Sequence, residues 1–166
     1  MGEIDIFSLS FILSVLRVST PLIFAAQAGL LSEKSGVVQI GLEGFMLAGA
    51  FSGAVFAHLT HSSYLGFLMA FVCGACASLL FSLLVVRLKT DAIVAGTGFN
   101  FLMAGLIPFL TKFLFNSTGS TPPIPIELRL SYEVTVFAFA VVIGIYFLIS
   151  KMRWGYWIQF AGEYPD

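Results

Sequence analysis

The sequence predicts an all-α integral membrane protein, a polytopic bundle of about five transmembrane helices. Of its 166 residues, 58% are hydrophobic and only 10% are charged, whereas a soluble domain carries roughly 25% charged residues. So few charged side chains cannot coat a globule of this size in water. Uninterrupted apolar runs such as residues 78–86 lack the alternation of a membrane β-barrel strand, so the spans are expected to be helices.

Five apolar stretches are long enough to be membrane spans, since crossing a bilayer core of about 30 Å takes roughly 20 helical residues. Short polar or turn-forming segments separate these stretches, and the longest connector, residues 115–131, is proline-rich. We expect one transmembrane domain over residues 1–166. Its expected spans are residues 6–31, 37–57, 64–86, 92–114 and 132–150.

The basic residues of the short loops predict the orientation, because Lys and Arg resist translocation and stay in the cytoplasm. One side of the five-span arrangement carries most of them, namely Lys34, Arg87, Lys89, Lys151 and Arg153. The other side carries only Lys112 and Arg129. The N-terminus is therefore expected outside and the C-terminus in the cytoplasm.

Polar residues at membrane depth are candidate functional groups. The second expected span opens with Gln39 and Glu43 beside several glycines, where helix continuity is predicted to be poor. An ionised, unpaired acid at this depth costs several kcal/mol, so Glu43 is expected to line a polar cavity, to form a structural ion pair with a cation such as Arg17, or to bind a proton. Thr97 and Asn100 of the fourth span are expected to bond either a solute or a neighbouring helix. The candidate path residues are therefore Gln39, Glu43, Thr97 and Asn100.

Several functions are disfavoured by the same residues. A net charge of −1 with scattered cations gives no footprint for nucleic acid. No glycine stands directly before Lys34-Ser35 or Lys89-Thr90, as a phosphate-binding loop requires, so we expect no ATP hydrolysis by this chain. We expect no catalytic residues, no metal site and no cofactor.

Three stretches carry a resemblance to a known family. Residues 17–22 followed by 29–47, which include the Gly36–Gly44 segment, form the longest of them. Residues 90–100 with the later 120–125 are the second, and residues 153–165 are the third. In these stretches the chain resembles the N-terminal half of permeases of bacterial ATP-binding-cassette (ABC) importers for nucleosides and simple sugars, which are related to the ribose and branched-chain amino-acid permeases.

The resemblance implies an importer permease in the bacterial inner membrane. Its expected partners are ATPase subunits, a second permease subunit, an extracytoplasmic solute-binding protein and membrane lipid. It also implies that residues leading to the ATPase-docking loop contribute to coupling, and these are Arg153, Gly155, Gly162 and Glu163. The chain departs from the family pattern at Tyr156-Trp157, usually Leu-Arg, and at Tyr164, usually Asn.

Two other interpretations stay open at this stage. A proton-coupled secondary transporter or a channel would use Glu43 without an ATPase. Family members are roughly twice as long, so the chain is also compatible with a truncated, non-transporting membrane protein, a fragment, or one of two pieces.

Overall fold

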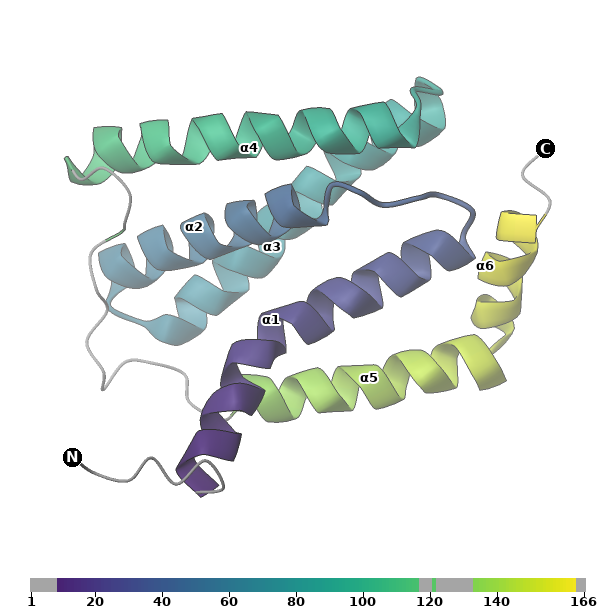
Figure 1. Cartoon of the computed structure of the whole chain (residues 1–166), viewed down its shortest axis with the longest axis horizontal. Coiled ribbons are helices and arrows are strands. Elements are labelled where there is room, and N and C mark those ends of the chain that lie inside the picture. The colour runs from purple at the N-terminus through teal and green to yellow at the C-terminus, as the bar shows by residue number, and fades with distance from the viewer. Residues whose placement is uncertain (1–8, 117–120, 122–132, 164–166) are drawn as a thin grey trace. The chain divides into compact units, whose positions relative to one another are not determined.

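The structure is a computed structural model that describes residues 9–116, 121 and 133–163. The start of the first expected span, most of the 115–131 connector with Arg129, and Tyr164 lie outside these residues. Every regular element in the described part is helical, which confirms the all-α prediction (Figure 1). The helices are α1 (Leu9–Lys34), α2 (Leu42–Thr60), α3 (Ser63–Ser82), η1 (Leu83–Arg87), α4 (Ala92–Phe115), α5 (Glu133–Lys151) and α6 (Arg153–Glu163).

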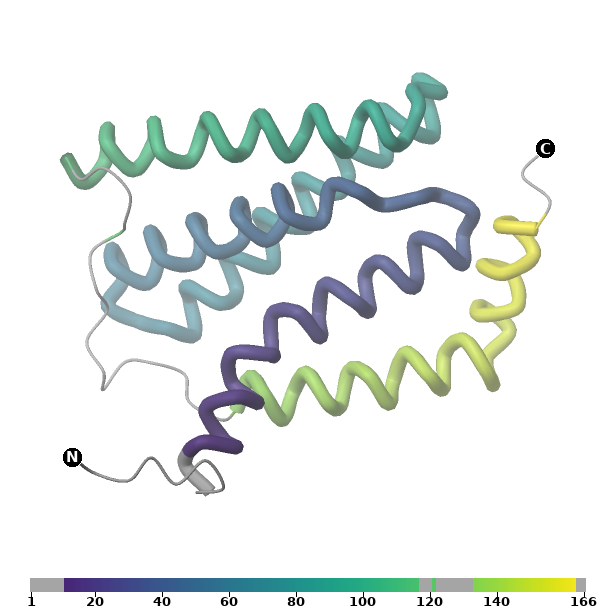
Figure 2. Tube along the Cα trace, viewed as in Figure 1, coloured from purple at the N-terminus to yellow at the C-terminus, as the bar shows by residue number. Residues whose placement is uncertain are grey.

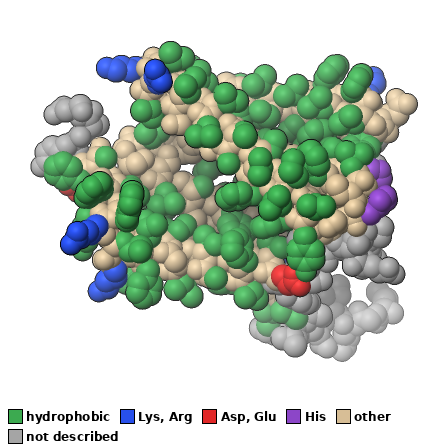
Figure 3. Space-filling model, turned by 180° about the vertical axis from the view of Figure 1, so that it is seen from behind, with side chains coloured by type: hydrophobic (Ala, Val, Ile, Leu, Met, Phe, Trp, Pro, Cys, Tyr) green, Lys and Arg blue, Asp and Glu red, His purple; other side chains and the backbone are tan. Residues whose placement is uncertain are grey.

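Five helices are long and apolar enough to cross a membrane, as the sequence predicted. They are Phe11–Lys34, Leu42–Thr60, Ser63–Arg87, Ala92–Phe115 and Glu133–Lys151. Large apolar side chains point away from the protein along them, with Phe101 79% and Phe113 78% exposed. Hydrophobic side chains are also spread over the face seen in Figure 3, with the described Lys, Arg, Asp, Glu and His side chains at its edges. In water such a surface would aggregate, so lipid is its natural solvent.

The chain divides into two compact units. Unit 1 contains residues 1–36 and 131–166, and unit 2 contains residues 37–130. In unit 1, α5 packs along α1, and α6 crosses the ends of both helices (Figure 2). In unit 2, α2 packs against both α3 and α4.

In unit 1, a polar and an aromatic contact join the middle of α1 to the beginning of α5. The hydroxyl groups of Thr20 and Thr135 lie 3.0 Å apart and are buried. The rings of Phe24 and Phe137 lie close by, with centroids 6.1 Å apart. Buried hydroxyls bonded to each other avoid the cost of leaving a polar group unpaired in an apolar interface.

Close approach between α2 and α3 depends on small residues. A Cβ atom on Gly66 would lie 2.7 Å from both the Cβ of Ala57 and the carbonyl oxygen of Gly53. Such contact brings two backbones together, and van der Waals packing of this kind drives helix association in lipid. Gly53 therefore takes part in the close contact between α2 and α3, whereas a Cβ atom on Gly74 of α3 would have no atom within 4 Å.

Two helix ends differ from the sequence-based boundaries. The first helix runs to Lys34. The chain then turns at Gly36, whose φ of +83° lies in the left-handed region that favours glycine. The second helix begins at Leu42 rather than at residue 37, and residues 37–41 are not helical. Hydropathy alone does not distinguish an extended apolar segment from a helical one.

Candidate functional site

The entry to α2 is a break in regular structure next to α4. We use "α2 entry" for residues 37–44 of this segment together with Gly96 and Asn100 of α4. The first N–H groups of a helix have no partner within the helix and need another acceptor. Gly41, at the N-cap, has no side chain to supply one. Asn100 supplies it from the neighbouring helix.

Asn100 forms two hydrogen bonds across the interface. The backbone N–H of Gly44 donates to its Oδ1 over 2.7 Å. Its Nδ2 donates to the carbonyl oxygen of Ile40 over 3.1 Å. The amide therefore caps α2 and also fixes the non-helical residue before it, a role that capping residues usually perform within their own helix.

Glycine contacts let α4 approach closely enough for this cap. A Cβ atom on Gly96 would lie 2.9 Å from the backbone nitrogen of Gly41. A Cβ atom on Gly44 would lie 2.8 Å from the ring of Phe99. Phe99 in turn stacks on Phe45 with centroids 4.4 Å apart. The α2 entry is thus a packed joint in which an added methyl group has no room.

The other predicted path residues lie at or near this joint. Gln39 is half-buried in the non-helical segment, and Glu43 is exposed in the first turn of α2. The positive end of a helix dipole favours a carboxylate in that first turn. Thr97 donates to the carbonyl oxygens of Ile93 and Val94 within α4, so its hydroxyl hydrogen is satisfied locally. Asn100 is the predicted path residue that contacts α2 directly.

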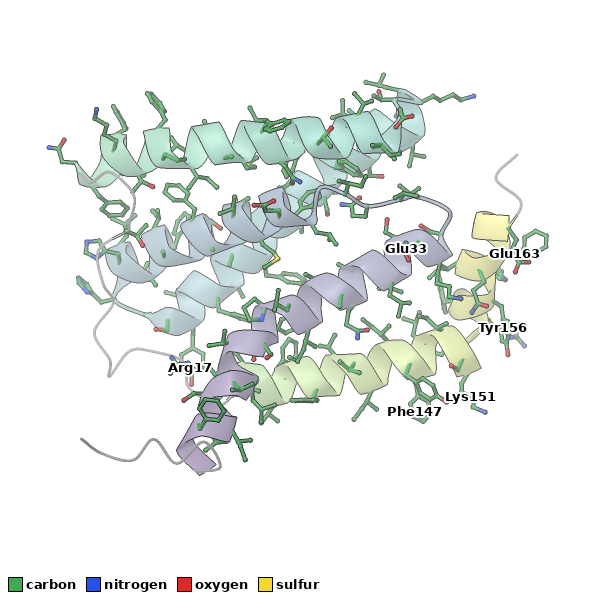
Figure 4. The ribbon with its side chains drawn as sticks, viewed as in Figure 1. Arg17, Glu33, Phe147, Lys151, Tyr156 and Glu163 are labelled. Atoms are coloured by element: carbon green, nitrogen blue, oxygen red, sulfur yellow. The ribbon has the colours of Figure 1, made fainter. Side chains whose placement is uncertain are left out.

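Arg17 and Glu43 belong to different units, and their ion pair stays a prediction. Arg17 is an exposed residue of α1 (Figure 4). Glu43 is an exposed residue of α2.

Removal of the Asn100 amide tests its capping role. Asn100→Leu leaves the buried N–H of Gly44 and the carbonyl of Ile40 without this partner, and we expect a loss of about 1–3 kcal/mol in unfolding free energy. Equilibrium unfolding in mixed micelles of mild detergent and SDS measures the change. The control is Ser78→Ala, because that exposed hydroxyl bonds only within its own helix. Equal stability of the two variants would contradict the cap.

The predicted coupling residues all lie on α6, at the ends of α1 and α5. A Cβ atom on the buried Gly155 would contact the carbonyl oxygen of Leu148 and lie 2.6 Å from the Cα of Ile149. A Cβ atom on Gly162 would contact the carbonyl oxygen of Lys34 and lie 2.9 Å from the nitrogen of Gly36. We call these contacts the α6 seat.

A side-chain hydrogen bond completes the α6 seat, since Nε2 of Gln159 donates to the carbonyl oxygen of Ile149 over 3.1 Å. Arg153 and Glu163 are exposed at the two ends of α6, and Glu163 is labelled in Figure 4. Gln159 was not among the sequence-predicted residues. The spacing of Gly155 and Gly162 contained a signal, because residues seven apart share one helix face, with Gln159 between them.

Five helices long and apolar enough to cross a membrane define a multi-pass membrane protein. The chain belongs to the family described as "Branched-chain amino acid transport system / permease component", whose model matches residues 11–166.

Two relatives extend the comparison. The chain is 29% identical to the guanosine ABC transporter permease protein NupQ of Bacillus subtilis, in an alignment that covers 89% of the chain. It is 30% identical to the nucleoside ABC transporter permease protein NupC of Lactococcus lactis, in an alignment that covers 92% of the chain. The alignments cover 54% and 56% of those proteins, so the chain spans about half the length of the curated relatives it matches. No solved structure matches the chain significantly.

Proposed function

We propose that this chain forms part of the membrane permease of an ATP-binding-cassette importer for nucleosides or related sugar-containing solutes. The observation that carries the proposal is the alignment of two nucleoside or guanosine permeases over 89% and 92% of the chain. The α2 entry supports it, because it includes the ionisable Glu43 at the start of a candidate span, and such residues inside spans often mark solute pathways.

In this proposal the solute passes the α2 entry. Gln39 and Glu43 offer an amide and a carboxylate, groups that hydrogen-bond the hydroxyls of a ribose or the edge of a base. Asn100 holds the entry in shape through its two bonds and lines the path beside Thr97. A second permease subunit would supply the opposite wall.

ATP hydrolysis belongs to separate ATPase subunits in this proposal, and an extracytoplasmic binding protein delivers the solute. The permease lies in the bacterial inner membrane with its N-terminus outside and its C-terminus in the cytoplasm. Arg153, Gly155, Gly162 and Glu163 act in coupling, because α6 contacts the ends of two spans and can transmit a push on one end of the bundle to both.

Uptake into membrane vesicles separates this function from its rivals. The full-length permease, its ATPase and its binding protein are expected to import radiolabelled guanosine only with ATP, and a proton ionophore is expected to leave that uptake intact. An ATPase variant that cannot hydrolyse ATP is the control. Uptake that persists without the ATPase and collapses with the proton gradient would indicate a secondary transporter. No flux from the complete assembly would indicate a non-transporting protein.

Glu43→Gln tests the proposed solute contact. A hydrogen bond to a charged group contributes about 1.5–3 kcal/mol, so its loss is expected to raise the KM for guanosine by about tenfold or more. Initial rates of ATP-driven uptake measure the change. Glu133→Gln makes the same chemical change at an exposed position in the first turn of α5 and is expected to leave KM unchanged. An unaltered KM and rate for Glu43→Gln at normal expression would remove Glu43 from the path.

A further inference from the structure

The α6 seat fixes α6 at the level where two spans end. Its inner face contacts Ile149 near the end of α5 and Gly36 just beyond the end of α1. Those helices have candidate spans that end at Lys151 and Lys34. The 11 residues of α6 rise about 16 Å, half of a bilayer core, so the helix cannot cross. A short helix held at the ends of two spans lies at the boundary between hydrocarbon and water.

The outer face of α6 is aromatic. Trp154 is 69% exposed, Trp157 72% and Phe160 66%, and Tyr156 at the edge of this face is 59% exposed. The two indole rings lie together, with centroids 6.1 Å apart. The buried Gly155 lies on the opposite face, in the seat. This division makes α6 amphipathic, with one face packed in the seat and the other largely exposed, and at the edge of the exposed face the Tyr156 hydroxyl donates to the carbonyl oxygen of Ser150 over 3.5 Å.

The chemistry of the outer face matches a lipid interface. Trp and Tyr combine an apolar ring with a polar N–H or O–H, and they concentrate where the acyl chains meet the headgroups. The exposed cations Lys151 and Arg153 stand at the start of the helix, where they can reach phosphate groups. Both tryptophans of the chain are on this one short face.

We propose that α6 is an interfacial helix whose outer face, formed by Trp154, Tyr156, Trp157 and Phe160, lies among the lipid headgroups and upper acyl chains. The lipid then holds the outer face while the seat holds the inner face, so that α6 stays in register with the ends of α1 and α5. This proposal depends on the membrane-spanning helices and not on which solute is carried.

Intrinsic fluorescence tests the proposal without labelling, because Trp154 and Trp157 are the only tryptophans. The chain is reconstituted in nanodiscs of phosphatidylcholine and phosphatidylglycerol. Replacing the phosphatidylcholine by a form with bromine high on its acyl chains is expected to quench the emission strongly, because interfacial indoles lie at that depth. Bromine near the chain ends is expected to quench less, and aqueous iodide is expected to quench weakly.

A tryptophan placed in the middle of a span supplies the matched control for depth. Phe101→Trp, made together with Trp154→Phe and Trp157→Phe, puts the indole on an exposed position of α4. Its emission is expected to be quenched more by the deep bromines than by the shallow ones. The single variants Trp154→Phe and Trp157→Phe report each native ring separately.

Two results would overturn the proposal. Strong quenching of the native rings by iodide, with no effect of either brominated lipid, would show that the rings lie in water. They would belong to a protein-docking surface if only the addition of the partner ATPase shifted and protected their emission. Either result would leave the proposed import function standing, since the uptake assay does not depend on where these rings lie.

Discussion

Gly66→Leu is expected to destabilise the protein by about 3 kcal/mol or more, because it forces α2 and α3 apart. Even the first carbon of the new side chain would lie 2.7 Å from Ala57 and from the carbonyl oxygen of Gly53. The clash is with backbone and with a side chain that has no flexible end to move. Helix association in lipid depends on close packing, so little else compensates for the lost contact. Equilibrium unfolding in mixed micelles of mild detergent and SDS measures the change.

Gly74→Leu is the matched control, because it makes the same substitution on the same helix. A Cβ atom on Gly74 meets no atom within 4 Å. In a helix interior the exchange also removes the conformational penalty of glycine, which is about 0.5–1 kcal/mol. Gly74→Leu is therefore expected to be neutral or slightly stabilising. Similar losses for the two variants would show that the Gly66 contact does not hold α2 to α3.

Gly162→Val is expected to detach α6 from the end of α1. The new side chain would overlap the carbonyl of Lys34 and the nitrogen of Gly36, and overpacking of this kind costs about 1–3 kcal/mol. Since about 1.4 kcal/mol is tenfold in an equilibrium, the equilibrium constant for seating is expected to fall by about fivefold to a hundredfold. In the complete importer, uptake is expected to fall with it.

Spin labels on exposed Glu33 and Glu163, both labelled in Figure 4, measure the seating directly. Cysteines introduced there, with Cys73 and Cys76 replaced by alanine, are expected to give one narrow distance distribution. Gly162→Val is expected to broaden it. Gly144→Val, on α5 where a Cβ meets nothing within 4 Å, is the control and is expected to leave it narrow. An unchanged distribution in Gly162→Val would show that the seat does not depend on this glycine.

The membrane spans were predictable from the sequence because they depend on local composition. An apolar run of about 20 residues in an almost uncharged chain has few alternatives to a spanning helix. Asp91 likewise marks the start of α4 locally, since its side chain accepts from the backbone nitrogens of Ile93 and Val94.

The start of α2 was less predictable because its cap comes from far along the chain. Asn100 lies 56 residues from Gly44, and nothing near Gly41 indicates that the two will meet. The polar character of Asn100 made it a candidate in the sequence, and both of its possible roles, solute contact and helix contact, were open. The structure gives the helix contact.

The α6 seat was also beyond local reasoning. The glycines of α6 were expected to act in coupling through a family resemblance, and that role stays a proposal. Their contacts with Ile149 and Gly36 depend on how α6 folds back after Lys151. The aromatic residues Tyr156 and Trp157, a departure from the family pattern, add to the aromatic outer face that Trp154 and Phe160 also form.

Labelling of the α2 entry tests most directly whether a solute passes it. Gln39→Cys, in a Cys73→Ala and Cys76→Ala background, is placed in the complete, working importer. A water-soluble thiol reagent is expected to modify the introduced thiol, and guanosine is expected to slow that reaction, whereas Gly105→Cys on α4 is expected to resist the reagent. If the thiol introduced by Gln39→Cys stayed unmodified with and without ATP, while the importer still transported guanosine, that result would contradict the account.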